Sequence, residues 1–199
     1  MTMSNERLVQ QLEFLMEIDH LKAIDRQTRI AAGRRENTAE HSWHLAMYAL
    51  ILAEHSNEDV DVLHVLALCL VHDIVEIDAG DTFAYDVAAN GDKEERERKA
   101  AERLFGLLPS DQAADMWRLW EEYEAMETPE SRFANAVDRM QPAMLNHVAG
   151  DDSTWKEHGV TLPQAVKRLS PIGDGSKVLW AHTQSIIDTA RERGHIRDE

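Results

Sequence analysis

The segment VLHVLALCLVHDIVE, residues 62–76, joins a nearly unbroken apolar run to three side chains that bind protons or metal ions. Residues 62–71 have the composition of a helix that other elements surround on all sides. The ionisable groups that follow are His72, Asp73 and Glu76. Because burial of such groups costs free energy unless a partner compensates it, the segment predicts that they face a common partner such as a metal ion.

Helical spacing of apolar residues dominates the rest of the chain as well. Capping signals mark several helix starts, among them the capping-box spacing of Asn37 and Glu40 and the Thr128-Pro129 pair. Strand signals are nearly absent, and no repeat or low-complexity tract divides the sequence. We therefore predict one all-α domain over residues 1–199, a bundle of about seven to nine helices. The expected helices cover residues 5–24, 37–55, 60–71, 93–108, 110–126, 128–148, 162–169 and 176–193, with an irregular link at 149–160.

The composition is that of a globular protein with an acidic surface. The chain has 199 residues, 43% of them apolar, and a formal net charge of −16. This charge argues against binding to nucleic-acid polymers or anionic membranes, but it allows a small anionic ligand in a local basic pocket. No apolar run reaches the roughly 18 residues that span a bilayer, and the N-terminus has no signal-peptide pattern. The lone cysteine, Cys69, fits a reducing compartment, so we expect a cytoplasmic location and a buried thiol.

The ionisable groups of the opening segment have spacing that suits a metal site. On a helix, His72, Asp73 and Glu76 lie within one turn of each other and can converge on one side. An imidazole nitrogen and a carboxylate oxygen together suit a divalent ion such as Mn²⁺, Co²⁺, Fe²⁺, Ni²⁺ or Zn²⁺. Taken alone, the pattern has a simpler explanation, because a histidine at a helix C-terminus interacts favourably with the negative end of the helix dipole.

Two residues elsewhere in the chain strengthen the metal hypothesis. His41 stands at the start of an apolar helix, where an imidazole is unexpected, and Asp138 lies beside the apolar stripe of its own helix. Each has an alternative role, His41 as a capping or surface residue and Asp138 as an ion-pair partner of Arg132 or Arg139. His44 is one turn after His41. It could contact and support a metal ligand, but we favour a packed or surface residue.

Two further features have competing interpretations. The helix expected at 110–126 carries Trp117, Trp120 and Tyr123 at helical spacing, which favours a place in the core or a dimer interface over a base-stacking platform. Lys93 begins a charged run that has the pattern of a solvated helix face, and its position also allows it to face the cleft.

The order of the candidate ligands is more specific than any one of them. The pattern His41 … His72-Asp73 … Asp138, with separations of 31 and 65 residues, resembles the HD-domain metal-dependent phosphohydrolase superfamily. The likeness is closest to the branch of HD-domain 5′-deoxynucleotidases. It rests on three segments: RRENTAEHSWHLAMYALIL at 34–52, ALCLVHDIVEIDAGD at 67–81 and LWEEYEAMETPESRFANAVDRM at 119–140. It covers roughly residues 8–145, and it leaves 150–199 as a C-terminal helical extension of open role.

The resemblance implies a set of site residues. Four side chains would bind one divalent metal ion (Mn, Co, Fe, Ni, Zn or Mg), namely His41, His72, Asp73 and Asp138. Glu76 would orient or deprotonate the attacking water, Asp81 would lie near the sugar and the scissile phosphate, and Arg26 would bind the substrate. The chain departs from the pattern at Gln27, where some members have an aromatic residue against the sugar, so the choice between deoxyribose and ribose stays open.

The activity that the resemblance implies is that of a metal-dependent phosphoric monoester hydrolase. It would be a 5′-nucleotidase that releases phosphate from (deoxy)nucleoside 5′-monophosphates by attack of a metal-bound water. The resemblance also implies a homodimer, for which the Trp-rich helix offers an apolar face. Three alternatives remain: a phosphodiesterase or nucleoside triphosphate hydrolase of the same superfamily, a non-catalytic metal- or nucleotide-binding regulatory module, and a helical scaffold with chance His and Asp residues.

Overall fold

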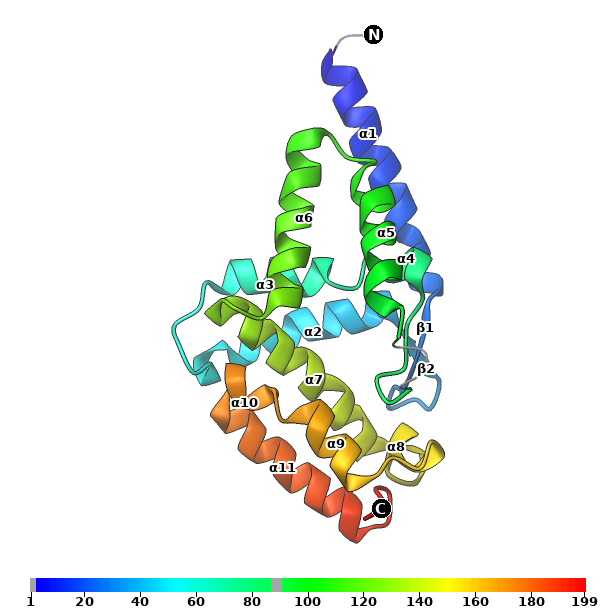
Figure 1. Cartoon of the computed structure of the whole chain (residues 1–199), viewed down its shortest axis with the longest axis vertical. Helices are drawn as coiled ribbons and strands as arrows, with labels where there is room; N and C mark the ends of the chain where they lie inside the picture. Colours follow the sequence, from blue (N-terminus) through cyan, green and yellow to red (C-terminus); the bar gives the residue numbers. More distant parts are fainter. Residues whose placement is uncertain (1–2, 87–90) are drawn as a thin grey trace.

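Figure 1 shows the computed structural model of the chain, which describes residues 3–86 and 91–199. Its elements are, in chain order, α1 (Met3–Glu17), η1 (Ile18–Ala23), β1 (Asp25–Arg29), β2 (Arg35–Asn37), α2 (Thr38–Leu52), η2 (Ala53–His55), α3 (Val62–Val71), α4 (Glu76–Ala79), α5 (Lys93–Phe105), α6 (Ser110–Ala125), α7 (Pro129–Ala149), η3 (Gly150–Asp152), α8 (Thr154–Glu157), α9 (Leu162–Leu169), α10 (Ile172–Gly175) and α11 (Lys177–Glu192). In the described ranges, eight α-helices have eight residues or more, and the predicted all-α fold class is confirmed.

The long helix α7 organises the molecule. It runs through the middle of the structure and packs against α2, α3, α6, α10 and α11. In Figure 1, α1, α5 and α6 form the upper part of the molecule, and α8 to α11 form the lower part. Residues from both parts therefore meet along α7, which carries Asp138.

Helix starts follow the capping signals of the sequence. α2 begins after Asn37, whose side chain accepts a hydrogen bond from the backbone N–H of Glu40, while the Glu40 carboxylate accepts one from the N–H of Asn37. α7 begins with Pro129, after the cap residue Thr128. Asp92 precedes α5, but its side chain makes no capping hydrogen bond.

The segment after α1 differs from the prediction. The helix expected over residues 5–24 ends at Glu17 and continues as the 3₁₀ helix η1. β1 and β2 then pair as an antiparallel ribbon that the sequence did not predict. Their residues, DRQTR and REN, are mostly charged and lack the apolar alternation that marks a strand. The predicted irregular link at 149–160 also contains two short elements, η3 and α8.

The end of α3 joins two groups of buried apolar side chains. The larger group lies between α2, α3, α7 and the C-terminal helices. The smaller one packs α5 and α6 against Val71, Ile74 and Val75. His72 and Asp73 lie between the buried residues Val71 and Ile74, in a turn that connects α3 to α4. α3 ends at Val71 as predicted, so the helical geometry considered for His72, Asp73 and Glu76 does not apply to all three, and Ile74 and Val75 reach the second group of apolar side chains.

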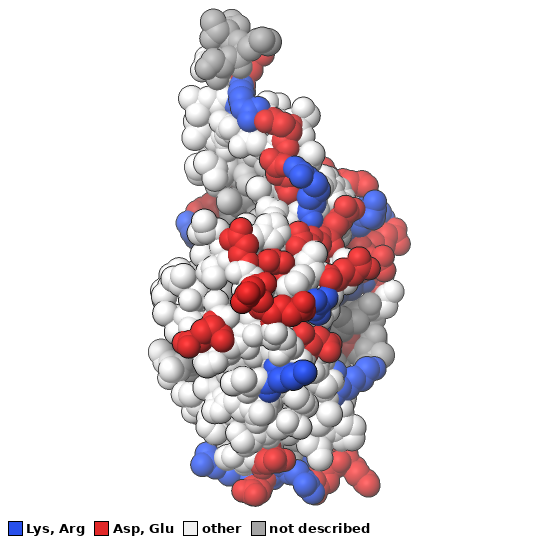
Figure 2. All heavy atoms as spheres, turned by 90° about the vertical axis from the view of Figure 1, so that its left-hand side faces the viewer, with Lys and Arg blue, Asp and Glu red and all other residues white. Residues whose placement is uncertain are grey.

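Acidic side chains gather on the outer surface. Figure 2 shows Asp and Glu crowded across the middle of one face of the molecule, with few Lys or Arg among them. This pattern agrees with the net charge of −16. Among the helices of the described residues, none combines the length and the apolar character that a membrane span requires.

The contact between α10 and α7 leaves no room for a side chain at Gly175. A Cβ there would overlap the carbonyl oxygen of Arg132 and would lie 2.8 Å from the Cβ of Ala136. Because overpacking of this kind costs about 1–3 kcal/mol, we expect Gly175→Ala to lower the free energy of unfolding by that amount in urea denaturation. The matched control is Gly173→Ala, whose Cβ would meet only Trp180, at 3.4 Å. Equal destabilisation by both changes would contradict the close contact.

Candidate metal centre

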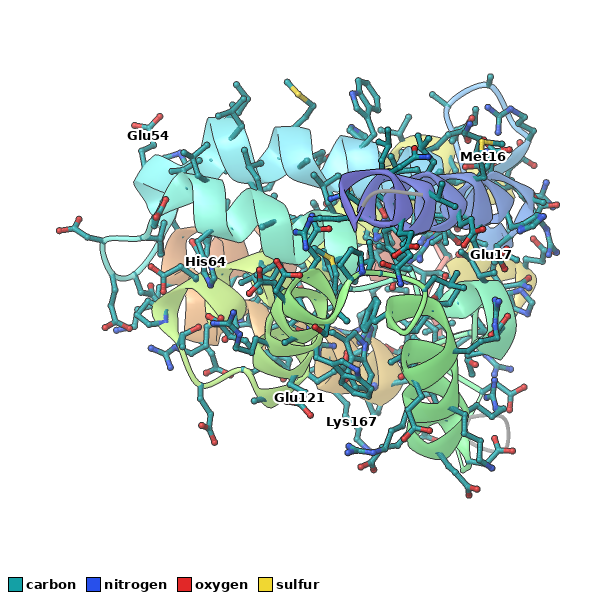
Figure 3. The ribbon with its side chains drawn as sticks, turned by 90° about the horizontal axis from the view of Figure 1, so that it is seen from above. Met16, Glu17, Glu54, His64, Glu121 and Lys167 are labelled. Atoms are coloured by element: carbon teal, nitrogen blue, oxygen red, sulfur yellow. The ribbon has the colours of Figure 1, made fainter. Side chains whose placement is uncertain are left out.

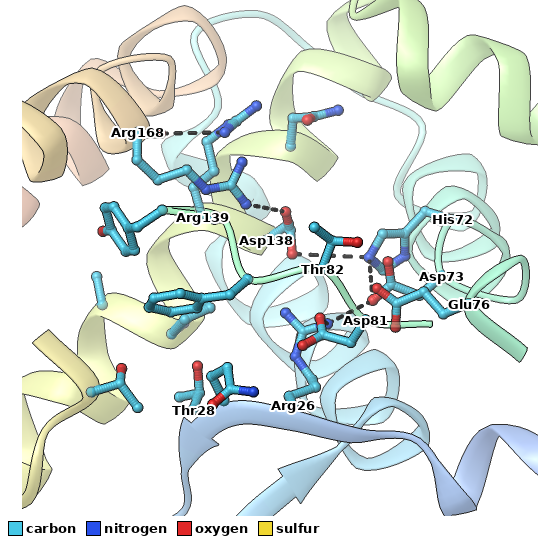
Figure 4. Close-up of a pocket in the computed structure, with 18 of the residues that line it drawn as sticks. Arg26, Thr28, His72, Asp73, Glu76, Asp81, Thr82, Asp138, Arg139 and Arg168 are labelled. Atoms are coloured by element: carbon cyan, nitrogen blue, oxygen red, sulfur yellow. Dashed lines mark hydrogen bonds and ion pairs between the residues drawn. The ribbon is translucent and has the colours of Figure 1, made fainter. Parts of the chain in front are cut away.

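Four side chains from α2, α7 and the turn after α3 meet at one place. Figure 4 shows three of them, His72, Asp73 and Asp138. Nε2 of His41 lies 3.0 Å from Oδ1 of Asp138 and 3.8 Å from Oδ2 of Asp73. Nε2 of His72 lies 3.2 Å from Oδ2 of Asp73 and 3.9 Å from Oδ1 of Asp138. His41, His72 and Asp73 offer ligand atoms that all lie within 4.8 Å of one another. The structure thus brings together all four residues that the sequence predicted as metal ligands.

Hydrogen bonds at the other ring nitrogen orient both imidazoles. Nδ1 of His72 donates to the backbone carbonyl of Cys69 at 2.9 Å. Nδ1 of His41 lies 3.1 Å from Oε1 of Gln141, and Nε2 of Gln141 donates to Oε1 of Glu36 at 2.7 Å. Because the Glu36 carboxylate only accepts, it fixes the Gln141 amide so that its oxygen faces His41. In the neutral imidazoles both Nε2 atoms therefore present lone pairs toward the cluster.

The chemistry of this donor set fits a divalent cation. Nε2 of His72 is buried and has no hydrogen-bond partner in the described part of the chain, and buried polar atoms are rarely left without one. Two imidazole nitrogens and two carboxylate oxygens that converge in this way suit Mn²⁺, Co²⁺, Fe²⁺, Ni²⁺ or Zn²⁺. The two carboxylates of Asp73 and Asp138 would balance the charge of the ion.

The pKa shifts in the cluster also indicate that positive charge stabilises it. Burial lowers the pKa of the His72 imidazole, but the carboxylates of Asp73 and Asp138 outweigh burial and raise this pKa to about 9. Burial raises the pKa of Asp138, but the hydrogen bond and charge of His41, with His72 and Arg168, hold this pKa well below its usual range. In the metal-free protein a proton on His72 therefore supplies part of the charge that a metal ion would bring.

The carboxylate of Glu76 lies in the pocket beside this cluster. Glu76 is buried and accepts a hydrogen bond from Oγ1 of Thr38 at 2.9 Å. Burial and the nearby charge of Asp73 raise the pKa of Glu76 well above its usual range, although Arg26 opposes this shift. Burial also raises the pKa of Asp81, which lines the same pocket. A raised pKa makes a carboxylate a stronger proton acceptor, as general base catalysis requires.

Arg26, on β1, is surrounded by carboxylates. Its guanidinium lies 3.0 Å from Asp73, 3.7 Å from Asp81 and 3.8 Å from Glu36. Burial lowers the pKa of Arg26, but Asp73, Glu76 and Asp81 outweigh burial and raise it. Arg26 thus holds Asp73 and Asp81 in place and compensates their charge.

A different part of the pocket carries two arginines that the sequence did not predict as site residues. Arg139 and Arg168 lie side by side in Figure 4, away from Arg26. Nη1 of Arg139 donates to the backbone carbonyl of Arg168 at 3.3 Å, and Nη2 of Arg168 lies 3.7 Å from Oδ2 of Asp138. In the sequence Arg139 was considered only as a partner of Asp138. No local signal marks Arg168, because α9 brings it to the site from the C-terminal extension.

Aromatic side chains line another part of the pocket. The ring of Phe83 lies 5.3 Å from that of Tyr85 and 4.5 Å from that of His158, measured between centroids. Nε1 of Trp155 donates to the hydroxyl of Tyr85 at 3.2 Å. Trp155 belongs to α8, so the C-terminal extension supports the segment that follows Asp81.

Two further histidines, His44 and His64, are not among the four candidate ligands. Nε2 of Gln141 lies 3.1 Å from Nδ1 of His44, so His44 belongs to the network that orients His41. His64 pairs with Glu122 at 2.8 Å on the outside of α3 (Figure 3).

The Trp-rich helix α6 packs within the chain. Trp120 is buried, and Trp117 packs against it with ring centroids 5.6 Å apart, so the core interpretation is confirmed. Tyr123 is also buried, lines the pocket and packs against His72 at 4.6 Å. Lys93, at the start of α5, lines the pocket as well.

The fold and the site define a class of proteins. A sequence model of the HD domain family matches residues 18–180, and the chain therefore belongs to the HD domain family. The matched range extends past residue 145, where the sequence motifs ended, and includes α8 and α9.

Individual similar proteins indicate a narrower group within the HD domain family. The chain is 32% identical over 143 residues to the 5′-deoxynucleotidase HDDC2 of Bos taurus, an alignment that covers 70% of this chain and 68% of that protein. It is 29% identical over 133 residues to the protein of the same name from Homo sapiens, covering 65% and 63%. The crystal structure of a predicted metal-dependent phosphohydrolase from Magnetospirillum magnetotacticum MS-1 matches with a TM-score of 0.93 and 52% identity, covering 98% of both chains. The chain is thus similar, over nearly its whole length, to a protein described as a predicted metal-dependent phosphohydrolase.

The network behind His41 generates a first prediction for this site. Replacing Gln141 by Leu removes the acceptor that fixes the His41 imidazole, and the loss of such a partner typically costs about 10–100-fold in metal affinity. We expect this decrease for Mn²⁺ in isothermal titration calorimetry. The control is Gln112→Leu, because the Gln112 side chain accepts a hydrogen bond from Gln11 near the start of α6, on a helix that supplies none of the four candidate ligands. Equal affinities of Gln141→Leu and wild type would remove Gln141 from the metal site.

The protonation of His72 generates a second prediction. Metal ions bind the neutral imidazole, whereas the pKa of about 9 keeps His72 protonated at neutral pH in the metal-free protein. Metal binding therefore releases this proton below pH 9, and affinity for Mn²⁺ should rise by about tenfold per pH unit between pH 6 and 8. Calorimetry in two buffers with different ionisation enthalpies counts the released protons. An affinity that does not change with pH would contradict this assignment.

Proposed function

We propose that the protein hydrolyses (deoxy)nucleoside 5′-monophosphates to a nucleoside and inorganic phosphate, with a divalent metal ion as cofactor. The observation that carries the proposal is the convergence of His41, His72, Asp73 and Asp138 beside the buried carboxylate of Glu76. A metal-binding site alone has no need for an additional carboxylate with a raised pKa. The similarity to proteins named 5′-deoxynucleotidase supports the same substrate class.

The four ligands would hold the ion between α2, α7 and the turn after α3. When bound, a divalent ion supplies an acidified water and neutralises charge on phosphoryl oxygens. Glu76 then accepts the proton of the attacking water, and its raised pKa suits this role. Asp81 is another carboxyl group of the pocket with a raised pKa, and it lies 3.7 Å from the guanidinium of Arg26. We assign it to proton supply at the leaving 5′ oxygen. Arg26 keeps Asp73 and Asp81 oriented.

The pocket also offers a surface for the nucleoside. Gln27 lines the pocket in place of the aromatic residue that some members of the family have there. Phe83 and Tyr85 line the same pocket and offer aromatic rings of their own. We propose that these rings contact the sugar or base.

Two expectations about the whole protein stay predictions. A homodimer is expected, but the Trp-rich helix α6 packs within the chain, whereas large exposed apolar side chains lie on α1 and α2, among them Leu12, Met16, Trp43 and Ile51. A cytoplasmic location is the other expectation.

A phosphate-release screen tests the substrate class. Purified protein is assayed with nucleoside mono-, di- and triphosphates in the presence of Mn²⁺, Co²⁺, Ni²⁺, Zn²⁺ or Mg²⁺. We expect inorganic phosphate from monophosphates, and higher rates for some ions than for others. Pyrophosphate or triphosphate from longer substrates, without turnover of monophosphates, would favour a nucleoside triphosphate hydrolase instead.

Glu76→Gln tests the catalytic assignment. Because an amide cannot accept the proton, we expect the turnover number to fall by about 10²–10⁴-fold. The variant should still bind one metal ion, because Glu76 is not among the proposed ligands. Asp78→Asn is the matched control, since Asp78 also lies on α4 but pairs with Arg103 outside the pocket. Full activity of Glu76→Gln would exclude Glu76 from proton transfer.

A further inference from the structure

Arg139 and Arg168 place two positive charges close together at one side of the pocket. Arg139 lies on α7, directly after the candidate ligand Asp138, and Arg168 lies on α9. Like charges repel, and Nη1 of Arg139 lies 3.3 Å from the backbone carbonyl oxygen of Arg168. Two positive charges held close together destabilise the folded state unless anionic groups lie near them.

The protein's own acids compensate this pair only weakly. Among the described residues, the Arg139 side chain donates hydrogen bonds to the carbonyl oxygen of Arg168 at 3.3 Å and to the sulfur of Met126 at 4.0 Å. Its Nε is buried and has no hydrogen-bond partner in the described residues. Arg168 reaches a single carboxylate there, that of Asp138, at 3.7 Å. This carboxylate is also a proposed metal ligand, so its negative charge would be shared between Arg168 and the metal ion.

The other cations of the pocket are more fully compensated. Arg26 contacts the carboxylates of Asp73, Asp81 and Glu36 within 3.8 Å. Lys93 pairs with Glu97 at 3.3 Å. The positive charge that remains for a bound anion thus lies mainly on Arg139 and Arg168, and not on the arginine that the family resemblance suggested.

We propose that Arg139 and Arg168 together bind the phosphate group of the substrate. The inference rests on the proposed function and assigns its anion-binding residues. A phosphate monoester carries nearly two negative charges at neutral pH and three acceptor oxygens, which match the planar donors of two guanidinium groups. Arg168 lies next to Asp138, so a phosphate bound there is adjacent to the candidate metal centre.

This assignment also gives the C-terminal extension a role. Arg168 lies on α9, which packs against α7 and α11. The extension therefore completes the pocket with a charged residue, in addition to the support that Trp155 gives to Tyr85. Substrate binding would depend on the helices after residue 150 and not only on the motifs before residue 145.

Direct binding of two probes tests the proposal without use of turnover. Inorganic phosphate and 2′-deoxyadenosine, which lacks the phosphate, are each titrated by calorimetry into the Mn²⁺-loaded protein. The variants are Arg168→Gln, Arg168→Lys and Arg139→Gln. Lys167→Gln is the matched control, because Lys167 is an exposed cation on the same helix and does not line the pocket (Figure 3).

We expect phosphate affinity to fall roughly ten- to a hundredfold in Arg168→Gln and in Arg139→Gln, because each loses charged hydrogen bonds to the anion. Arg168→Lys should lose less, and Lys167→Gln should match the wild type. Affinity for 2′-deoxyadenosine should stay within about twofold in all variants. If Arg139→Gln does not fold, the two Arg168 variants decide the question alone.

Two results would overturn the proposal. The first is phosphate affinity within about twofold of wild type in both Gln variants, and the second is a wild-type protein that does not bind phosphate at millimolar concentration. The proposed function fails separately. If phosphate binds through these arginines while no nucleoside monophosphate is hydrolysed, the anion site stands and the nucleotidase activity does not.

Discussion

The structure depends on the charge balance of a buried cluster of acids and imidazoles. Asp73 and Asp138 approach both His41 and His72 within 3.9 Å, in a place where burial strengthens every charge interaction. The folded chain tolerates this cluster because positive charge reaches it from Arg26, from a proton on His72 and, in our proposal, from a divalent ion. The positions of α2, α3 and α7 serve this arrangement, since each element or its adjacent turn supplies at least one member.

The residues around the cluster have two different roles in the pocket. On one side, Glu36 and Gln141 orient His41, and Thr38 contacts Glu76. On another, Arg139 and Arg168 leave positive charge open to the pocket. The groups that are paired within the protein thus hold His41 and Glu76 in position. In our proposal, Arg139 and Arg168 have fewer such partners and bind the phosphate of the substrate.

The sequence predicted the helical fold and the four candidate ligands because these leave local or ordered patterns. Apolar spacing marks the long helices, and the order of His41, the His72-Asp73 pair and Asp138 is specific even though each residue alone is ambiguous. The β1–β2 ribbon was missed because its charged residues carry no alternation. The end of α3 at Val71 was predicted, but the spacing of His72, Asp73 and Glu76 could not show that a turn connects them, because separations of three and four residues also fit a helix. Arg168 was missed because only the packing of α9 brings it to the pocket.

A crystal structure of the protein soaked with Mn²⁺, with anomalous scattering measured at a wavelength where manganese scatters strongly, tests the central claim most directly. We expect one strong anomalous peak per chain, in contact with Nε2 of His41, Nε2 of His72 and the carboxylates of Asp73 and Asp138. A peak elsewhere with this place empty, or no peak at saturating Mn²⁺, would contradict it.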